Sequence, residues 1–232
     1  MAEIDTQLSG PEEIIEPTLL SEIAVVASLA FAVLALFIFS WLGGEVLRGD
    51  TQHFDQSVRN WVHQFASPGM TRAMTFISLL GYNLLVLELL IAFGFFAWLR
   101  WRRAALWLAV ATAGSLALDT ALKYAYHRAR PVAFFGVAPH SYSFPSGHAL
   151  CSFCFYGVLA GLLSARTKAL SWRILIWTVA AVLVAAIGLS RIYLGVHYPS
   201  DVLGGYLAAT MWVGTIIVLD HVIKARKRRR EV

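Results

Sequence analysis

The stretch IAVVASLAFAVLALFIFSWLGG, residues 23–44, runs for 22 residues without a charged side chain. About 20 consecutive apolar residues are enough to cross the hydrocarbon core of a bilayer as an α-helix. Because several more apolar stretches follow, the sequence predicts an all-α integral membrane protein with six transmembrane helices. The other five stretches are 73–99 (interrupted by Glu88), 104–122 (interrupted by Asp119), 147–165, 174–190 and 202–219.

The composition agrees with a membrane location and argues against a nucleic-acid partner. Hydrophobic residues make up 58% of the chain and charged residues only 14%, whereas about 25% of the residues in soluble domains are charged. The net charge of +5 owes much to a basic tail behind the last apolar stretch, which is typical of a topology signal that contacts anionic lipids. The acidic start of the chain lacks the basic residues of a signal peptide, so we expect the first span to be retained. The expected parts are a cytoplasmic N-terminal tail (1–21), one transmembrane domain (22–223) and a basic cytoplasmic tail (224–232).

The loops between the apolar stretches predict the orientation. Lys and Arg gather at 100–103, 166–173 and 224–230, which six spans place on one side, and such clusters favour the cytoplasm. Both termini are then cytoplasmic, and the remaining loops face the outer, periplasmic side of a bacterial inner-type membrane. Between the first two spans, apolar residues recur at helical spacing among polar ones, which predicts an amphipathic helix in the membrane interface. These residues are Phe54, Val58, Trp61, Val62 and Phe65.

Three polar segments lie at the outward ends of the predicted helices: 123–131 (KYAYHRARP), 143–148 (SFPSGH) and 190–201 (SRIYLGVHYPSD). Their cations lie at the membrane boundary, where unpaired charge is costly and tends to be functional. Guanidinium forks and a Lys point charge suit phosphate oxygens, and the free N–H groups of a helix start bind anions. The segments therefore predict a phosphate site without a metal or cofactor. We expect Lys123, Arg130, Arg191, Ser146 and Gly147 to form it.

Two histidines can supply the chemistry. His197 and Asp201 are four residues apart, and a carboxylate bonded to one imidazole nitrogen leaves the other nitrogen free as a nucleophile. His148 lies beside the predicted phosphate site and could protonate the leaving oxygen as a general acid. The implied reaction passes through a phosphohistidine that water then hydrolyses.

These motifs, Lys-x6-Arg-Pro, Pro-Ser-Gly-His and Ser-Arg-x5-His-x3-Asp in this order, resemble the signature of the type 2 phosphatidic acid phosphatase superfamily. The resemblance implies metal-independent hydrolysis of lipid phosphates such as phosphatidic acid, phosphatidylglycerol phosphate or undecaprenyl diphosphate. It also implies that His197 is the nucleophile, His148 the acid and Asp201 the orienting carboxylate. The matching residues are Lys123, Arg130, Pro131, Pro145, Ser146, Gly147, His148, Ser190, Arg191, His197 and Asp201.

Further polar residues have both structural and functional interpretations. Asp119 lies four residues before Lys123, so the two should share a helix face; the pair either aims the ammonium at the phosphate or is a simple structural ion pair. Pro131 and Ser190 are candidates for supporting the site from behind. We expect Glu88 to contact a polar group on another helix. We expect Cys151 and Cys154 to have an ordinary packing role, and the loop residues His127, Arg128 and His140 to be solvated.

Alternative functions remain at this point. A phosphotransferase would pass the phosphoryl group to a lipid acceptor instead of water. A non-catalytic lipid-binding or transport protein would use the cations for recognition alone, although binding needs no oriented nucleophile. A vanadate-dependent haloperoxidase suits an intramembrane, lipid-level pocket less well than a phosphatase.

Overall fold

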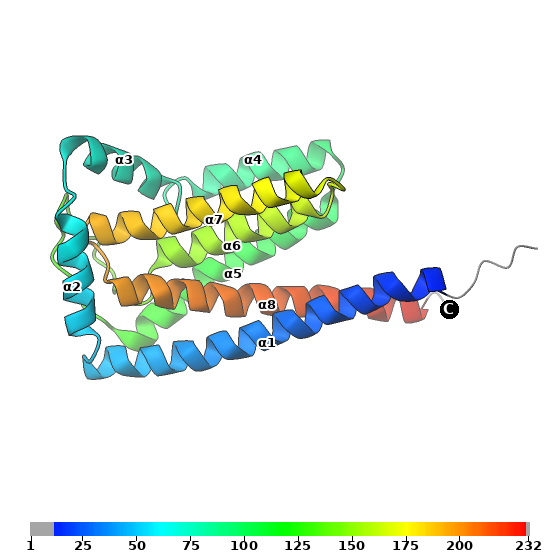
Figure 1. Ribbon diagram of the computed structural model, residues 1–232, viewed down its shortest axis with the longest axis horizontal. Coiled ribbons are helices and arrows are strands. Elements are labelled where there is room, and N and C mark those ends of the chain that lie inside the picture. The colour runs from blue at the N-terminus through cyan, green and yellow to red at the C-terminus, as the bar shows by residue number, and fades with distance from the viewer. Residues whose placement is uncertain (1–11, 231–232) are drawn as a thin grey trace, which may run out of the picture.

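A computed structural model of the chain describes residues 12–230, with side chains described at 23 and 25–226, and this part of the chain is helical and contains no strand (Figure 1). Residues 1–11 of the expected N-terminal tail and residues 231–232 lie outside it. The helices are α1 (Glu12–Arg48), α2 (Gln52–His63), α3 (Pro68–Leu79), α4 (Leu85–Trp98), α5 (Arg102–Tyr126), α6 (Gly147–Ser164), α7 (Leu170–Tyr193) and α8 (Pro199–Arg230).

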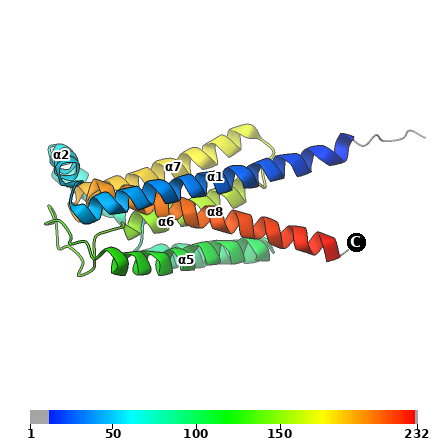
Figure 2. The ribbon, with the colours of Figure 1, turned by 90° about the horizontal axis from the view of Figure 1, so that it is seen from below.

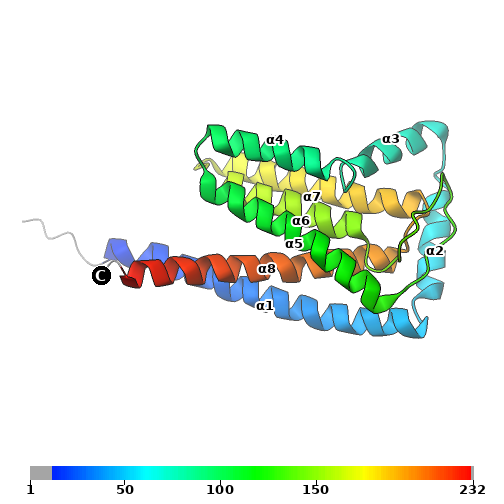
Figure 3. The ribbon, with the colours of Figure 1, turned by 180° about the vertical axis from the view of Figure 1, so that it is seen from behind.

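The long helices run along a common direction and form a bundle (Figures 1 and 3). Helix α6 lies at its centre and contacts α5, α7 and α8, while α1 packs along α8. Figure 2 shows α5 on the face of the bundle away from α1 and α7. Buried Phe96, Leu108, Leu150 and Phe155 belong to the core between these helices. The hydrophobic surface of α1 and α7 is largely exposed, as expected for helices that face lipid.

Among the residues that the structure describes, five helices are long and apolar enough to cross a membrane: α1, α5, α6, α7 and α8. Each contains one of the predicted apolar stretches, to within one residue at the end of α6. The first and last helices also continue into the expected tails, because α1 begins at Glu12 and α8 ends at Arg230.

The single helix predicted over 73–99 is instead two helices, α3 and α4, joined by a turn at residues 80–84. Helix α3 begins with Ser67 as its N-cap, whose hydroxyl accepts a bond from the backbone N–H of Met70 at 3.3 Å. Apolar composition concealed the break, which falls at Gly81 and Asn83, both poor helix formers. A Cβ at Gly81 would lie 2.5 Å from Ile187 and 3.0 Å from His148. The turn therefore brings backbone close to a predicted catalytic residue.

The helix predicted between the first two spans is α2, which lies across one end of the bundle (Figures 1 and 3). Its charged residues Asp55 and Arg59 face inward and are buried, while Phe54 and Trp61 are exposed. The same end of the bundle holds the C-terminal ends of α5 and α7 and the N-terminal ends of α6 and α8. All three motif segments therefore meet beneath α2.

Candidate active site

A cavity of about 670 Å³ lies where the three motif segments meet. The predicted site residues that line it come from α5, α6, α7 and the loops between the helices: Lys123, Arg130, Gly147, His148, Arg191 and His197. Asp201 and Ser146 are fully buried and are not part of the lining. The structure thus brings the predicted residues together, and three cations face one cavity.

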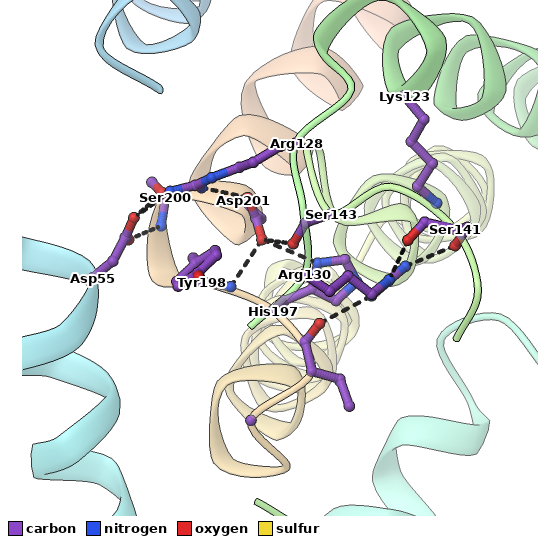
Figure 4. A network of polar contacts seen from close by, with 12 residues as sticks. Asp55, Lys123, Arg128, Arg130, Ser141, Ser143, His197, Tyr198, Ser200 and Asp201 are labelled. Carbon is purple, nitrogen blue, oxygen red and sulfur yellow. Dashed lines mark hydrogen bonds and ion pairs between the residues drawn. The ribbon is translucent and has the colours of Figure 1, made fainter. Parts of the chain in front are cut away.

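His197 is held between Asp201 and Arg130 (Figure 4). Its Nδ1 lies 3.3 Å from Asp201 Oδ2, and its Nε2 lies 2.9 Å from Arg130 Nη1. A guanidinium can only donate hydrogen bonds, so Nε2 must be the acceptor and Nδ1 must carry the proton. This geometry assigns the tautomer that leaves a lone pair on Nε2.

The surroundings of His197 also keep the ring neutral. The pKa of His197 is lowered to about 3, mainly by burial and also by the charge of Arg130, whereas the hydrogen bond to Asp201 opposes the shift. A neutral imidazole retains its nucleophilic lone pair at neutral pH.

Arg130 is fixed by the loops on both sides of the site. Its Nε donates to the carbonyl of Ser141 at 2.7 Å, its Nη2 to the Ser141 hydroxyl at 2.9 Å, and its Nη1 to the carbonyl of Val196 at 2.9 Å. Burial lowers the pKa of Arg130, and Asp201 and Asp119 oppose this. Arginine nevertheless stays charged in proteins, so the guanidinium presents a rigid positive charge beside His197.

Several buried polar atoms at the site have no protein partner among the described residues. They are His148 Nε2, Arg191 Nε and the hydroxyl of Ser146. Arg191 is otherwise held by Nη1, which donates to the hydroxyl of Ser78 on α3. The His148 ring stacks on Tyr82, from the turn after α3, with 5.3 Å between ring centroids. Buried polar atoms are normally satisfied, and an anion in the cavity suits the N–H and O–H groups among them.

The contact predicted between Asp119 and Lys123 is present, with Lys123 Nζ 2.8 Å from Asp119 Oδ2. The Asp119 carboxylate also explains why position 147 is occupied by a glycine. A Cβ there would lie 2.8 Å from both Asp119 oxygens. Gly147 therefore lets the buried carboxylate of α5 pack against the start of α6.

The prediction that Arg128 is solvated was wrong, because its guanidinium is largely buried between two carboxylates (Figure 4). Nη1 donates to Asp201 Oδ1 at 2.6 Å, and Nη2 donates to Asp55 Oδ2 at 2.7 Å. Burial lowers the pKa of Arg128, but Asp201 and Asp55 outweigh this and raise it. Nothing in the sequence pairs Arg128 with Asp55, which lies 73 residues away. Sequence reasoning also missed Tyr82, Ser78, Ser141 and Ser143.

The remaining predicted residues lie around the site or away from it. Pro131 is buried beside Arg130, while the Ser190 hydroxyl donates to the carbonyl of Ile187 at 2.6 Å within its own helix. The partner expected for Glu88 is Tyr156 on α6, whose hydroxyl donates to it at 2.9 Å. Cys151 and Cys154 are buried, free thiols in the core. His127 is exposed and packs on Tyr142, and exposed His140 lines a second cavity of about 650 Å³ that shares Lys123 and Arg130 with the first.

Comparisons with known proteins show the family to which the chain belongs. Phosphatidylglycerophosphatase B of Bacillus subtilis is 30% identical over 200 residues, which cover 84% of this chain and 98% of the relative. An undecaprenyl-diphosphatase of Sulfolobus acidocaldarius is 28% identical over 199 residues, covering 82% of this chain and 87% of the relative. The crystal structure of a transmembrane PAP2-type phosphatidylglycerolphosphate phosphatase from Bacillus subtilis matches with a TM-score of 0.71 at 27% identity, over 85% of this chain and 96% of that one. The sequence model of the PAP2 superfamily matches residues 104–224, and the chain belongs to this superfamily, as its three motifs predicted.

Proposed function

We propose that this protein is an integral membrane lipid phosphatase that hydrolyses a lipid phosphate or diphosphate through a phosphohistidine. One observation carries the proposal: His197 Nε2 is unprotonated and accepts a hydrogen bond from Arg130 Nη1 at the wall of a cavity that Lys123, Arg130 and Arg191 also line. The similar proteins described above are phosphatases of a phosphatidylglycerol phosphate and of undecaprenyl diphosphate. Their names support lipid phosphates as the substrate class.

In the first step, Arg130 Nη1 transfers its hydrogen bond from His197 Nε2 to a phosphate oxygen, and the freed lone pair of Nε2 attacks phosphorus and forms the N–P bond. The bond from phosphorus to the leaving oxygen breaks, and protonated His148 transfers its proton to that oxygen. Asp201 accepts the hydrogen bond that the Nδ1–H of His197 donates, and it stabilises the positive charge that develops on the His197 ring.

In the second step, His148 removes a proton from water, whose oxygen attacks the phosphohistidine. The N–P bond breaks and inorganic phosphate leaves. During both steps the cations and the donors of Ser146 and Gly147 stabilise the charge on the equatorial oxygens, which is the main contribution of a protein to phosphoryl transfer. Asp119 supports this by holding the Lys123 ammonium at the cavity wall, and Pro131 and Ser190 support the backbone behind Arg130 and Arg191.

In the proposed placement the chain crosses the membrane six times, because α4 crosses in addition to the five long apolar helices. The crossings lie within one transmembrane domain (22–223), which the tails 1–21 and 224–232 flank. Basic residues between α4 and α5 and between α6 and α7 support a cytoplasmic location for these loops and for both termini. The active site is then on the outer side of a bacterial inner-type membrane. The exposed aromatic rings of Phe54 and Trp61 suit a helix α2 that lies in the outer interface.

The test is phosphate release by the detergent-purified protein from phosphatidic acid, phosphatidylglycerol phosphate and an isoprenyl diphosphate, in the presence of EDTA. We expect release to persist with EDTA and to fall roughly 10⁴-fold or more in His197→Ala, because removing a nucleophile disables the whole catalytic unit. His221→Ala, which removes a histidine near the opposite end of α8, is the matched control and should behave like the wild type.

Equal release by His197→Ala and the wild type would exclude His197 as the nucleophile. Release that requires a second lipid as acceptor would identify a phosphotransferase instead. Loss of release with EDTA would contradict the metal-independent mechanism.

A further inference from the structure

Asp55 on α2 is a fully buried carboxylate that the proposed reaction does not use. All of its hydrogen bonds come from other elements: Oδ1 accepts from the backbone N–H of Ser200 at 2.9 Å, and Oδ2 accepts from the Ser200 hydroxyl and Arg128 Nη2, each at 2.7 Å. A buried charge is costly unless it is paired and hydrogen-bonded. Asp55 therefore depends on partners that lie directly beside the catalytic dyad.

Arg128 connects Asp55 to Asp201. One terminal nitrogen donates to each carboxylate, at 2.7 Å and 2.6 Å, and the ring of Tyr198 stacks against the guanidinium with its centroid 4.2 Å from Cζ. A planar fork held at both ends and on one face has little freedom to rotate. Figure 4 shows the resulting chain of contacts from Asp55 through Arg128 to Asp201 and His197.

The two oxygens of Asp201 have different partners. Oδ1 accepts from Arg128, whereas Oδ2 accepts from the Ser143 hydroxyl and from the backbone N–H of Tyr198 at 2.8 Å and lies 3.3 Å from His197 Nδ1. A rotated carboxylate would lose these separate contacts. Arg128 thus holds Oδ1 while Ser143 and the Tyr198 N–H hold Oδ2. Asp55 in turn holds Arg128, together with the hydroxyls of Thr51 and Ser200.

We infer that Asp55 and Arg128 are positioning residues, which hold the Asp201 carboxylate so that His197 Nε2 faces the cavity. This inference rests on the proposed phosphatase function, because it assigns their effect to the nucleophile. Neither residue lines the cavity that holds His197 and His148, although Arg128 lines the second cavity, so their loss should slow the chemical step without weakening phosphate binding at the first cavity.

The charges around Asp201 give a second readout. The groups that face it are His197 and Arg128, with Asp55 beyond Arg128, Arg130 beyond His197, and the buried Arg59 of α2 close enough to interact with both carboxylates. Without Arg128, Asp55 and Asp201 would lose the cation that bridges them and keep only Arg59 and Arg130 nearby, and like charges make one of two carboxylates harder to ionise. More alkaline conditions would then be needed to keep Asp201 ionised.

The experiment compares Asp55→Asn, Arg128→Gln and Arg128→Lys in the full-length, detergent-purified protein. The readouts are kcat, KM, inhibition by inorganic phosphate and the pH dependence of kcat. Asp55→Asn should lower kcat by about tenfold and Arg128→Gln by about 100-fold, since small misplacements of reacting groups cost up to about that much. KM and the inhibition constant of phosphate should stay within about twofold, because the cations of the cavity are untouched.

The pH dependence should separate the two Arg128 variants. In Arg128→Gln, the rise of kcat on the acid side of the pH profile should move to higher pH. Arg128→Lys should return this rise to its wild-type pH, since the positive charge is restored. It should not restore the value of kcat, because one ammonium cannot bridge both carboxylates as the guanidinium of Arg128 does. Asp220→Asn, at the other end of the bundle, removes a carboxylate from an ion-paired cluster and is the control with unchanged kcat.

Wild-type kcat in folded Asp55→Asn and Arg128→Lys, together with an unshifted pH profile in Arg128→Gln, would overturn the inference and show that the pair only stabilises the fold. A rise in KM and in the phosphate inhibition constant as large as the fall in kcat would also overturn it, in favour of a role in binding. Should Asp55→Asn not fold, Arg128→Lys decides by the same criteria. His197→Ala run in parallel separates the hypotheses: if it stays active, the proposed function fails, whereas if it is inactive and the positioning variants equal the wild type, only this inference fails.

Discussion

Each end of the bundle contains a cluster of ion pairs, and the two clusters have opposite compositions. At the end covered by α2, one base, Arg128, bridges the acids Asp55 and Asp201. At the opposite end one acid, Asp220, bridges the bases Arg103 and Lys224, at 2.6 Å and 2.7 Å. The side-chain exposure differs: 12% for Arg128 and 0% for its partners, but 47% for Arg103, 53% for Lys224 and 21% for Asp220.

This difference determines what each cluster can do. Breaking a buried pair leaves an uncompensated charge and costs about 3–5 kcal/mol, whereas an exposed pair contributes about 0–1 kcal/mol because water and salt screen it. Similar sets of charges can therefore hold a catalytic group in place at one end and only support helix contacts at the other. Burial, rather than the number of ion pairs, distinguishes the site.

The largest effect should come from Asp201→Asn at the buried end. An amide cannot stabilise positive charge on His197 and can favour the wrong tautomer, so we expect kcat to fall roughly 10³–10⁴-fold, as for other carboxylates that orient a catalytic histidine. Steady-state phosphate release measures it, and circular dichroism controls for folding. A fall of less than about tenfold in folded protein would remove Asp201 from the catalytic unit.

An intermediate effect should appear in the pH dependence of stability. The pKa of folded His197 is about 3, below its ordinary value of 6.5, so the unfolded chain binds more protons between these values. The stability that neutral His197 contributes is fully present above pH 6.5 and is lost as the pH falls towards 3. The thermal midpoint of His197→Asn should therefore fall less steeply than that of the wild type over this window, and parallel curves would contradict the prediction.

The smallest effect should come from Asp220→Asn at the exposed end. We expect the free energy of unfolding to change by less than about 1 kcal/mol, and less at high salt, because the cluster is screened. Thermal unfolding at low and high salt measures this. A change as large as that of Asp55→Asn would break the comparison, since it would show that exposure does not separate the two clusters.

Periodicity and composition were sufficient to predict most of the fold. Long apolar runs predicted α1, α5, α6, α7 and α8 because lipid requires continuous apolar helices. They did not predict the break between α3 and α4, because Gly81 and Asn83 stand within an otherwise apolar stretch. A hydropathy average is insensitive to two such residues.

The site was predictable to the extent that its contacts are local or carried by motifs. The four-residue spacings predicted the contacts of His197 with Asp201 and of Lys123 with Asp119. The burial of Arg128 was not predictable, because its partner Asp55 is brought to it only by the packing of α2 across the bundle. Tyr82 escaped notice for the same reason, since only the turn after α3 places it on His148.

The break between α3 and α4 also bears on the thickness of the surrounding membrane. In the proposed placement α4 crosses the membrane, but with 14 residues it rises only about 21 Å, well short of the roughly 30 Å of a hydrocarbon core. Bilayers adapt to a short apolar segment by thinning locally. Since the α3–α4 turn carries Tyr82 to the cavity, we expect lipid head groups to sink beside α4 to the level of His148, so that a substrate can reach the site while its chains remain in the bilayer.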